Sequence, residues 1–201
     1  MKNKIGIYFV VAAVIALLYS CSGKKITGEY YLQHQRELDK IELTFWELYR
    51  QQPFSLSFSD RAFRTISLEI HTDTLTYIYD FLVNDPRIKD TLTRYNLSAT
   101  GVTNLIGLMQ QIRCTWVNHF DYYIDQTKKS LIFISVKPVA IQSFFSATRY
   151  YIITYYSQPQ LFDSEGRLLD KKRPRRLRRI NGEIFHRIND TVCYAVSGQF
   201  R

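Results

Sequence analysis

Two histidines each precede an aspartate by two positions: His71 precedes Asp73, and His119 precedes Asp121. Residues i and i+2 of a β-strand point to the same face, so either pair could offer an imidazole and a carboxylate to one metal ion. His186 could then supply a third ligand. Such spacings also arise often by chance. We therefore expect the protein to bind neither a metal ion nor a cofactor.

Cys114 and His119 are residue types that can act as a nucleophile and its base. Their spacing along the chain predicts opposite faces of a strand, and no helix N-terminus that would lower the thiol pKa is evident nearby. The chain also lacks the G-x-S-x-G, H-E-x-x-H, Walker and G-x-G-x-x-G motifs. We therefore predict no catalytic residue.

A strongly basic run is the most prominent compositional feature of the chain. It leads into Ile180-Asn181-Gly182, a hairpin signal, so it could form an edge strand whose charges block edge-to-edge aggregation. Alternatively, it could contact anionic lipid headgroups, an anionic glycan or an acidic partner protein. The basic residues are Lys171, Lys172, Arg173, Arg175, Arg176, Arg178 and Arg179.

The N-terminus has the pattern of an export signal. Lys2 and Lys4 precede Ile5 to Tyr19, an uncharged and mostly apolar stretch of 15 residues. A membrane-spanning helix needs roughly 20 such residues, so the stretch indicates a secretory signal peptide. The residues that follow, Leu18-Tyr19-Ser20-Cys21, resemble the lipobox of bacterial lipoproteins, with Tyr19 in place of the usual small or β-branched residue.

This resemblance implies a signal peptide over residues 1–20 and a lipid, including palmitate, attached to Cys21. Ser22 does not match the retention signal for the inner membrane, so the resemblance implies the outer membrane of a bacterial envelope, facing the periplasm or the surface. The alternative is an uncleaved signal anchor, with Lys24 and Lys25 at the far interface.

Composition predicts one folded domain behind a short tether. The chain has 201 residues, a net charge of +9 and 46% hydrophobic residues, which excludes a disordered chain. We place a lipidated tether at 21–28 and a single domain at 29–201. In an exported protein the positive charge favours lipid or glycan over nucleic acid. Cys114 and Cys193 could form a disulfide there, although buried free thiols are the simpler expectation.

Helical periodicity dominates the N-terminal half. A helix is predicted over Glu29 to Gln52, with Tyr31, Leu38, Ile41, Phe45 and Leu48 as its apolar stripe. Alternation predicts a strand over 65–70, and the segment 72–82 is predicted as a helix, with a strand as the alternative. Further helices are predicted from Asp85-Pro86 and from about Thr100.

The C-terminal half alternates with a period of two and predicts a run of strands, at 115–124, 131–137, 148–157, 176–180, 183–188 and 191–197. The expected fold class is α+β, with N-terminal amphipathic helices packed on one face of an antiparallel, meander-type sheet formed mainly by the C-terminal half. Tyr150 to Tyr156 is apolar on both faces, so we expect a central strand covered twice. The second cover could be the curled sheet, a homodimer or a partner.

These observations favour a non-catalytic, membrane-anchored envelope lipoprotein with a binding or scaffolding role. One alternative is an accessory subunit of a secretion, conjugation or surface-assembly machine. An alternative of another class is a hydrolase or metal-dependent enzyme that acts on envelope polymers. The partners expected are the membrane through the lipid anchor, a protein partner or a second copy of the chain, and an anionic lipid or glycan.

Overall fold

The computed structural model describes residues 22–124, 126–136, 150–171 and 173–198. The described residues from 36 onward form one compact unit, and residues 22–35 belong to a separate one. The predicted signal peptide, Cys21 and Lys172 lie outside the described residues. The three described helices are α2 (Ser22–Tyr49), α3 (Arg87–Arg94) and α4 (Ala99–Gln111).

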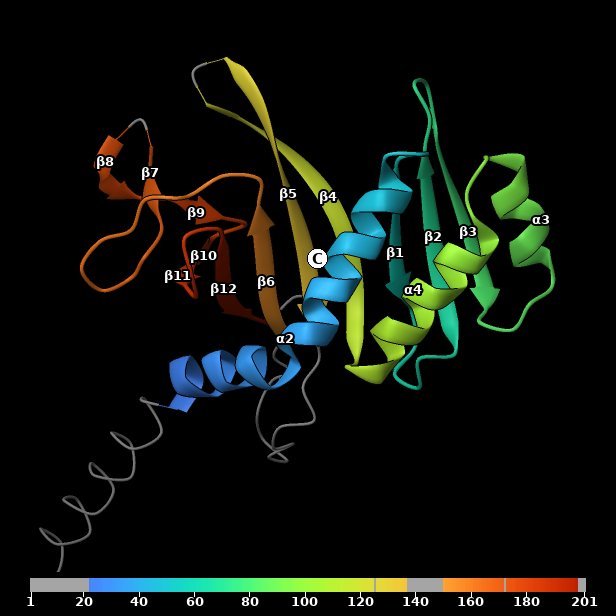
Figure 1. Cartoon of the computed structure of the whole chain (residues 1–201), viewed down its shortest axis with the longest axis horizontal. Helices are drawn as coiled ribbons and strands as arrows, with labels where there is room; N and C mark the ends of the chain where they lie inside the picture. The colour runs from blue at the N-terminus through green and yellow to red at the C-terminus, as the bar shows by residue number, and fades with distance from the viewer. Residues whose placement is uncertain (1–21, 125, 137–149, 172, 199–201) are drawn as a thin grey trace, which may run out of the picture. The chain divides into compact units, whose positions relative to one another are not determined.

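One antiparallel sheet holds most of the strands, in the order β11-β12-β6-β5-β4-β1-β2-β3 (Figure 1). Two small two-stranded sheets, β7–β8 and β9–β10, lie outside it. The α+β class is therefore confirmed. The strands are β1 (Phe54–Phe58), β2 (Thr65–His71), β3 (Thr76–Leu82), β4 (Cys114–Ile124), β5 (Thr127–Val136), β6 (Tyr150–Tyr156), β7 (Leu169–Asp170), β8 (Arg173–Leu177), β9 (Arg179–Ile180), β10 (Glu183–Ile184), β11 (His186–Arg187) and β12 (Val192–Ser197).

The sheet is a meander only in part. Strands β1, β2 and β3 follow one another, as do β4, β5 and β6, and the pairing of β1 with β4 joins the two runs. Strand β12 then adds directly to β6, because β7 to β10 leave the main sheet. The predicted strands at 176–180 and 183–188 are consequently broken into short pieces, of which only β11 belongs to the main sheet.

Helix α4 and the part of α2 from residue 36 onward lie on one face of the main sheet (Figure 1). Within residues 36–49 of α2, the predicted stripe is buried, and the Phe45 ring lies 5.1 Å from the ring of Phe54 on β1. The apolar stripe predicted for α4 is buried as well. Its N-cap is Ser98, whose Oγ accepts a hydrogen bond of 3.1 Å from the Gly101 amide. The buried residues are Leu38, Ile41, Phe45 and Leu48 of α2, and Val102, Leu105, Ile106 and Met109 of α4.

The start of α2 differs from the sequence prediction. The helix begins at Ser22 rather than Glu29, and its backbone is kinked at His34, where φ is −115° and ψ is 17°. The segment expected as a tether is therefore helical from Ser22 onward. A tether can be helical, so the predicted domain boundaries stay a prediction.

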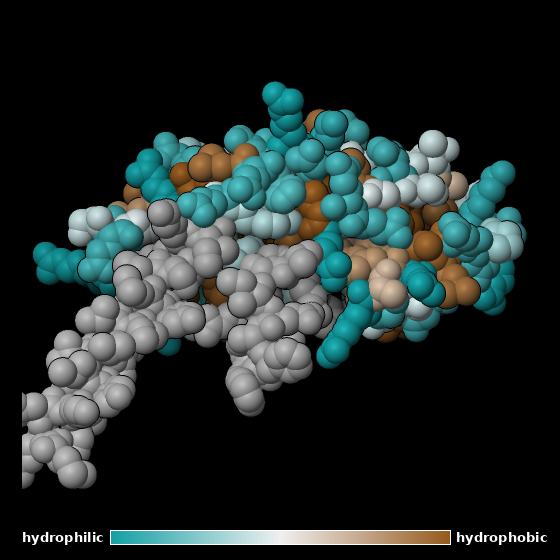
Figure 2. Space-filling model, turned by 90° about the horizontal axis from the view of Figure 1, so that it is seen from below, coloured by the Kyte–Doolittle hydropathy of each residue, from teal (hydrophilic) through white to brown (hydrophobic). Residues whose placement is uncertain are grey.

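The prediction of a helix over 72–82 is wrong. Thr72 closes a turn onto the Leu75 carbonyl, and β3 then pairs with β2 from His71↔Thr76 to Thr65↔Leu82. A helix there would need its stripe buried, yet Leu75, Ile78 and Leu82 are exposed. Pairing with β2 satisfies the backbone hydrogen bonds of β3 instead. Hydrophobic surface is visible at the right-hand end of the molecule, the end at which β3 lies (Figure 2).

Strand β6 is central and covered on both faces, as predicted. The face turned away from the helices is covered by the chain's own segment between β6 and β12, through residues that include Leu168 and Phe185. The chain itself therefore supplies this cover. The buried cluster on this face contains Trp116, Tyr122, Leu131, Phe133, Ile152, Tyr156, Leu168, Phe185, Cys193 and Ala195.

Candidate functional site

The basic run forms a small hairpin outside the main sheet (Figure 1). Strand β8 pairs with β7, with Asp170 opposite Arg173 and Leu169 opposite Leu177. We call residues 169–179 the basic hairpin. A strand with this many guanidinium groups cannot lie under a second apolar layer, because each buried charge would need a partner. The run accordingly lies outside the main sheet, and the strand predicted at 176–180 is divided between β8 and β9.

Four arginines of the basic hairpin project into solvent. Among the described residues, none of the ion pairs involves any of them. Their charges are therefore available to an anionic surface or to an acidic protein. They are Arg173, Arg175, Arg176 and Arg179.

Arg178 has a structural role instead. Its guanidinium lies 4.9 Å from the Tyr122 ring centroid and 5.8 Å from that of Tyr156, both in the buried cluster. A cation over an aromatic face is attracted by the ring quadrupole. Arg178 thus fixes the basic hairpin to the sheet. Among the arginines predicted to contact an anionic partner, Arg178 therefore differs from the four exposed ones.

Lys171 lies in the turn between β7 and β8 of the same hairpin, close to other positive charges. Partial burial lowers its pKa, and the nearby charges of Arg178 and Lys129 lower the pKa further. Lys129 belongs to β5, so the positive surface extends from the basic hairpin to the hairpin that joins β4 and β5. Sequence reasoning missed this contribution because Lys129 is far from the run in the chain.

The His119 and Asp121 pair shares one face of β4, as the spacing predicts. His119 Nε2 lies 3.9 Å from Asp121 Oδ1, and Lys128 Nζ lies 2.8 Å from Asp121 Oδ2. Burial lowers the pKa of His119, more than the neighbouring Asp121 raises it. The imidazole packs against the rings of Tyr49 and Trp46, so it belongs to the interface between α2 and the sheet.

The other histidines named by the sequence lie elsewhere. His71 Nδ1 is 3.1 Å from Thr76 Oγ1 on the neighbouring strand β3, and His186 is on β11 at the opposite edge of the sheet. In the part of the chain that the structure describes, no three His, Cys, Asp or Glu side chains are grouped to hold a metal ion. The structure does not bring His186 to either His-x-Asp pair.

Cys114 and Cys193 are buried, free thiols. Strands β5 and β6 separate their strands, which puts the two residues at least roughly 14 Å apart at about 4.8 Å per strand, too far for a disulfide. Burial raises the pKa of each thiol to about 12.

A β-bulge after Cys114 changes one sequence-based expectation. It places Cys114 opposite Val136 and His119 opposite Ile132, hence on the same face of β4 and not on opposite faces. Four positions of β5 still separate them, which is roughly 13 Å. They are therefore too far apart to act as a nucleophile and base.

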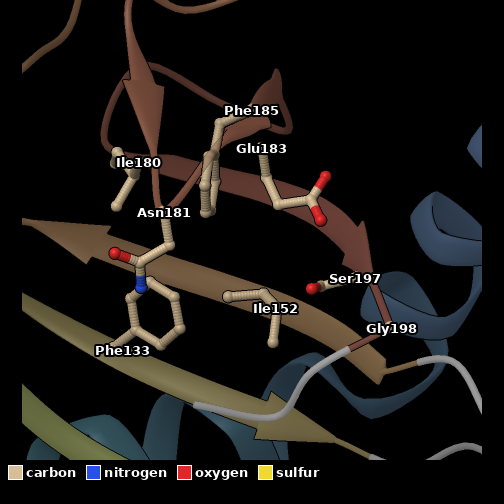
Figure 3. A pocket seen from close by; sticks show the side chains of 8 residues that line it. All are labelled: Phe133, Ile152, Ile180, Asn181, Glu183, Phe185, Ser197 and Gly198. Carbon is tan, nitrogen blue, oxygen red and sulfur yellow. The ribbon is translucent and has the colours of Figure 1, made fainter.

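Sequence reasoning did not find a pocket on the sheet face opposite the helices (Figure 3). It has a volume of about 270 Å³ and lies between the main sheet and the β9–β10 hairpin. The hairpin itself is signalled by Asn181-Gly182, but the sequence does not show which strands it faces. The lining residues are Phe133, Ile152, Ile180, Asn181, Glu183, Phe185, Ser197 and Gly198.

Comparison of the chain with protein-family models, with curated proteins and with solved structures gives no match. None of the helices in the described ranges combines the length and the apolar character needed to cross a membrane.

Proposed function

We propose that the protein is a non-catalytic envelope lipoprotein, anchored through Cys21, whose folded domain binds anionic phospholipid headgroups with the basic hairpin. The observation that carries the proposal is the set of four exposed arginines without an ion pair among the described residues. The lipobox-like sequence around Cys21 supports the anchor, and the net charge of +9 supports an anionic surface as the target.

The energetics favour a surface contact that works together with an anchor. A basic residue close to an anionic membrane contributes about 1 kcal/mol, so four arginines supply about 4 kcal/mol, which corresponds to weak binding on its own. An anchored domain meets the membrane at a high effective concentration, and a weak contact is then enough to fix its orientation. Arg178 supports this role because it holds the basic hairpin against Tyr122 and Tyr156.

The test is co-sedimentation of the chain from Ser22 onward with vesicles of rising anionic lipid content. The double variant Arg175→Glu with Arg176→Glu reverses two charges, so we expect its association with anionic vesicles to fall at least tenfold. Raising the salt concentration should weaken binding of the unmodified chain, because the screening length is only about 8 Å at physiological ionic strength. Vesicles of zwitterionic lipid should bind neither form.

The matched control is Lys89→Glu with Arg94→Glu, which makes the same change in net charge on exposed positions of α3, beside β3 at the far end of the sheet. This control should keep most of the binding. Equal losses in both double variants would show that only net charge matters and would remove the basic hairpin from the proposal. Undiminished vesicle binding in the hairpin variant, or co-purification with an acidic protein that the variant loses, would also contradict lipid as the target.

The anchor has its own test. Intact-mass measurement of the protein purified from its native membranes should show a diacylglyceryl modification on Cys21, and Cys21→Ala should leave Met1 in place without lipid. An unmodified Met1 in the natural chain would contradict the anchor and favour the uncleaved signal anchor instead.

A further inference from the structure

We infer that the pocket between the main sheet and the β9–β10 hairpin binds a small organic cation, an amine carried on an apolar body. This inference is independent of the proposed contact with lipid, since the pocket does not include the exposed arginines. It is carried by the shape of the cavity, by the apolar groups on its floor and by one carboxylate at its rim.

The floor and one wall of the pocket are apolar. Phe133 of β5 and Ile152 of β6 rise from adjacent strands, and Phe185 faces them from the segment across (Figure 3). The Phe133 and Phe185 rings lie 6.2 Å apart in an edge-to-face arrangement. These groups belong to the buried cluster, so the floor is rigidly packed. An apolar body of matching shape would leave water when it enters.

The opposite side of the pocket carries a carboxylate that has no partner among the described residues. No hydrogen bond or ion pair within the described ranges engages the Glu183 side chain, which is half-buried. Its carboxylate is turned toward the end of β12, where Ser197 lies (Figure 3). Asn181 also lines the pocket, with its amide beside Phe133 (Figure 3).

The position of Glu183 is fixed by its turn. Ile180 pairs with Glu183 across β9 and β10, and the two turn residues, Asn181 and Gly182, both have positive φ angles, of 51° and 83°. This is the geometry of a type I′ turn, in which Asn-Gly is the preferred sequence. The turn therefore presents Glu183 to the cavity from a constrained backbone rather than from a long loop.

The chemistry of the lining selects the charge of the ligand. An anion would be repelled by Glu183, and a neutral apolar molecule would displace water from the carboxylate without replacing its hydrogen bonds. An ammonium group pairs with the carboxylate, while the apolar body that carries it meets the apolar side of the pocket. A cation with an apolar body is thus the class of ligand that satisfies both sides of the pocket.

The volume limits the size of the ligand. A cavity of 150 Å³ holds one benzene molecule, so a pocket of about 270 Å³ accommodates roughly ten heavy atoms. 2-Phenylethylamine has this size, and its ring and ammonium group are separated by a short flexible linker. Its neutral counterpart, 2-phenylethanol, has the same shape and differs in charge, which makes the pair a direct test.

The experiment is titration of the full-length protein in detergent with each compound at pH 7, followed by the change in its tryptophan fluorescence and by ligand-observed NMR. Trp116 serves as the reporter because its ring lies 5.6 Å from that of Phe133 on the pocket floor. We expect the amine to bind at least tenfold more tightly than the alcohol. Glu183→Gln should lower the affinity for the amine at least tenfold and leave the affinity for the alcohol nearly unchanged.

Glu165→Gln is the matched control, because it removes one exposed carboxylate from the turn before β7 without touching the pocket. It should bind both compounds like the unmodified chain. Equal affinity for amine and alcohol, amine binding that survives in Glu183→Gln, or no binding of either compound at millimolar concentration would each overturn the inference. Because vesicle binding is measured separately with the arginine variants, failure of one proposal leaves the other intact.

Discussion

The imidazole of His119 lies against the phenol ring of Tyr49, with ring centroids 4.3 Å apart and planes inclined by 29°. Trp46, one turn earlier on α2, lies 5.5 Å from the same imidazole. The His119 side chain is only 6% exposed, and its Nε2 has no hydrogen-bond partner. His119, which the sequence suggested as a metal ligand, therefore packs as an aromatic ring between α2 and the sheet.

The free energy of unfolding should decrease as the pH falls below about 6.5. Burial lowers the pKa of His119 in the folded state, so the unfolded chain takes up a proton first. Asp121 and Lys128 face the same imidazole and act on its pKa in opposite directions, Asp121 raising it and Lys128 lowering it. Urea unfolding at pH 7.5 and pH 5.5 measures the effect, which cannot exceed about 1.4 kcal/mol per pH unit for one proton.

His119→Phe keeps the ring and removes the titration, so the loss of stability between these two pH values should shrink. His71→Gln is the control, because it removes a histidine that pairs with Thr76 rather than packing under aromatic rings, and it should retain the pH dependence. A pH dependence that persists in His119→Phe would show that another group is responsible.

Both cysteines should be inert in the folded protein. Cys114 and Cys193 are buried and their thiol pKa values are raised to about 12, so neither forms the reactive thiolate at neutral pH. An aromatic disulfide reagent should modify no thiol of the domain within minutes under native conditions and both thiols in denaturant. Rapid modification of either residue in the native state, or a mass two units lower that indicates a disulfide, would contradict this strand arrangement.

The sequence predicts which face of a helix or strand is buried better than it predicts which elements pair with one another. The α4 stripe from Val102 to Met109 is buried as its spacing requires, because helical periodicity reports directly on which face is covered. The segment from Thr76 to Leu82 fits both periods, and its pairing with β2 decides the outcome. Strand β1 was not predicted, although Ser55 and Ser57 alternate with Phe54, Leu56 and Phe58, which is the period of a strand.

The candidate sites show the same limit. The basic run is visible in the sequence, but only the contact of Arg178 with Tyr122 and Tyr156 tells the anchoring arginine from the exposed ones. The pocket needs Phe133 of β5 and Glu183 of β10 to line the same cavity, and neither residue carries a local signal of that proximity. Long-range packing, and not composition, determines both.

Arg178 and Arg175 should therefore respond differently to the same substitution. Arg178→Gln removes a cation from the faces of two buried rings, and we expect the free energy of unfolding to fall by about 1 kcal/mol. Arg175→Gln changes an exposed side chain and should alter stability by less than about 0.5 kcal/mol. Chemical denaturation of both variants provides the comparison, and equal effects would show that Arg178 is not an anchor.

The two glycines of α4 should likewise differ when replaced by alanine. A Cβ at Gly101 would lie 2.7 Å from Cδ2 of Leu48, which is buried between α2 and α4, whereas a Cβ at Gly107 would meet nothing within 4 Å. Gly107→Ala should stabilise the protein by about 0.5–1 kcal/mol, the usual gain of alanine over glycine inside a helix. Gly101→Ala makes the same gain but forces Leu48 to move, at a cost of about 1–3 kcal/mol. The net effect of Gly101→Ala should be destabilising. Thermal unfolding of the two variants side by side measures the difference. A Gly101→Ala protein as stable as Gly107→Ala would show that α4 does not approach α2 this closely.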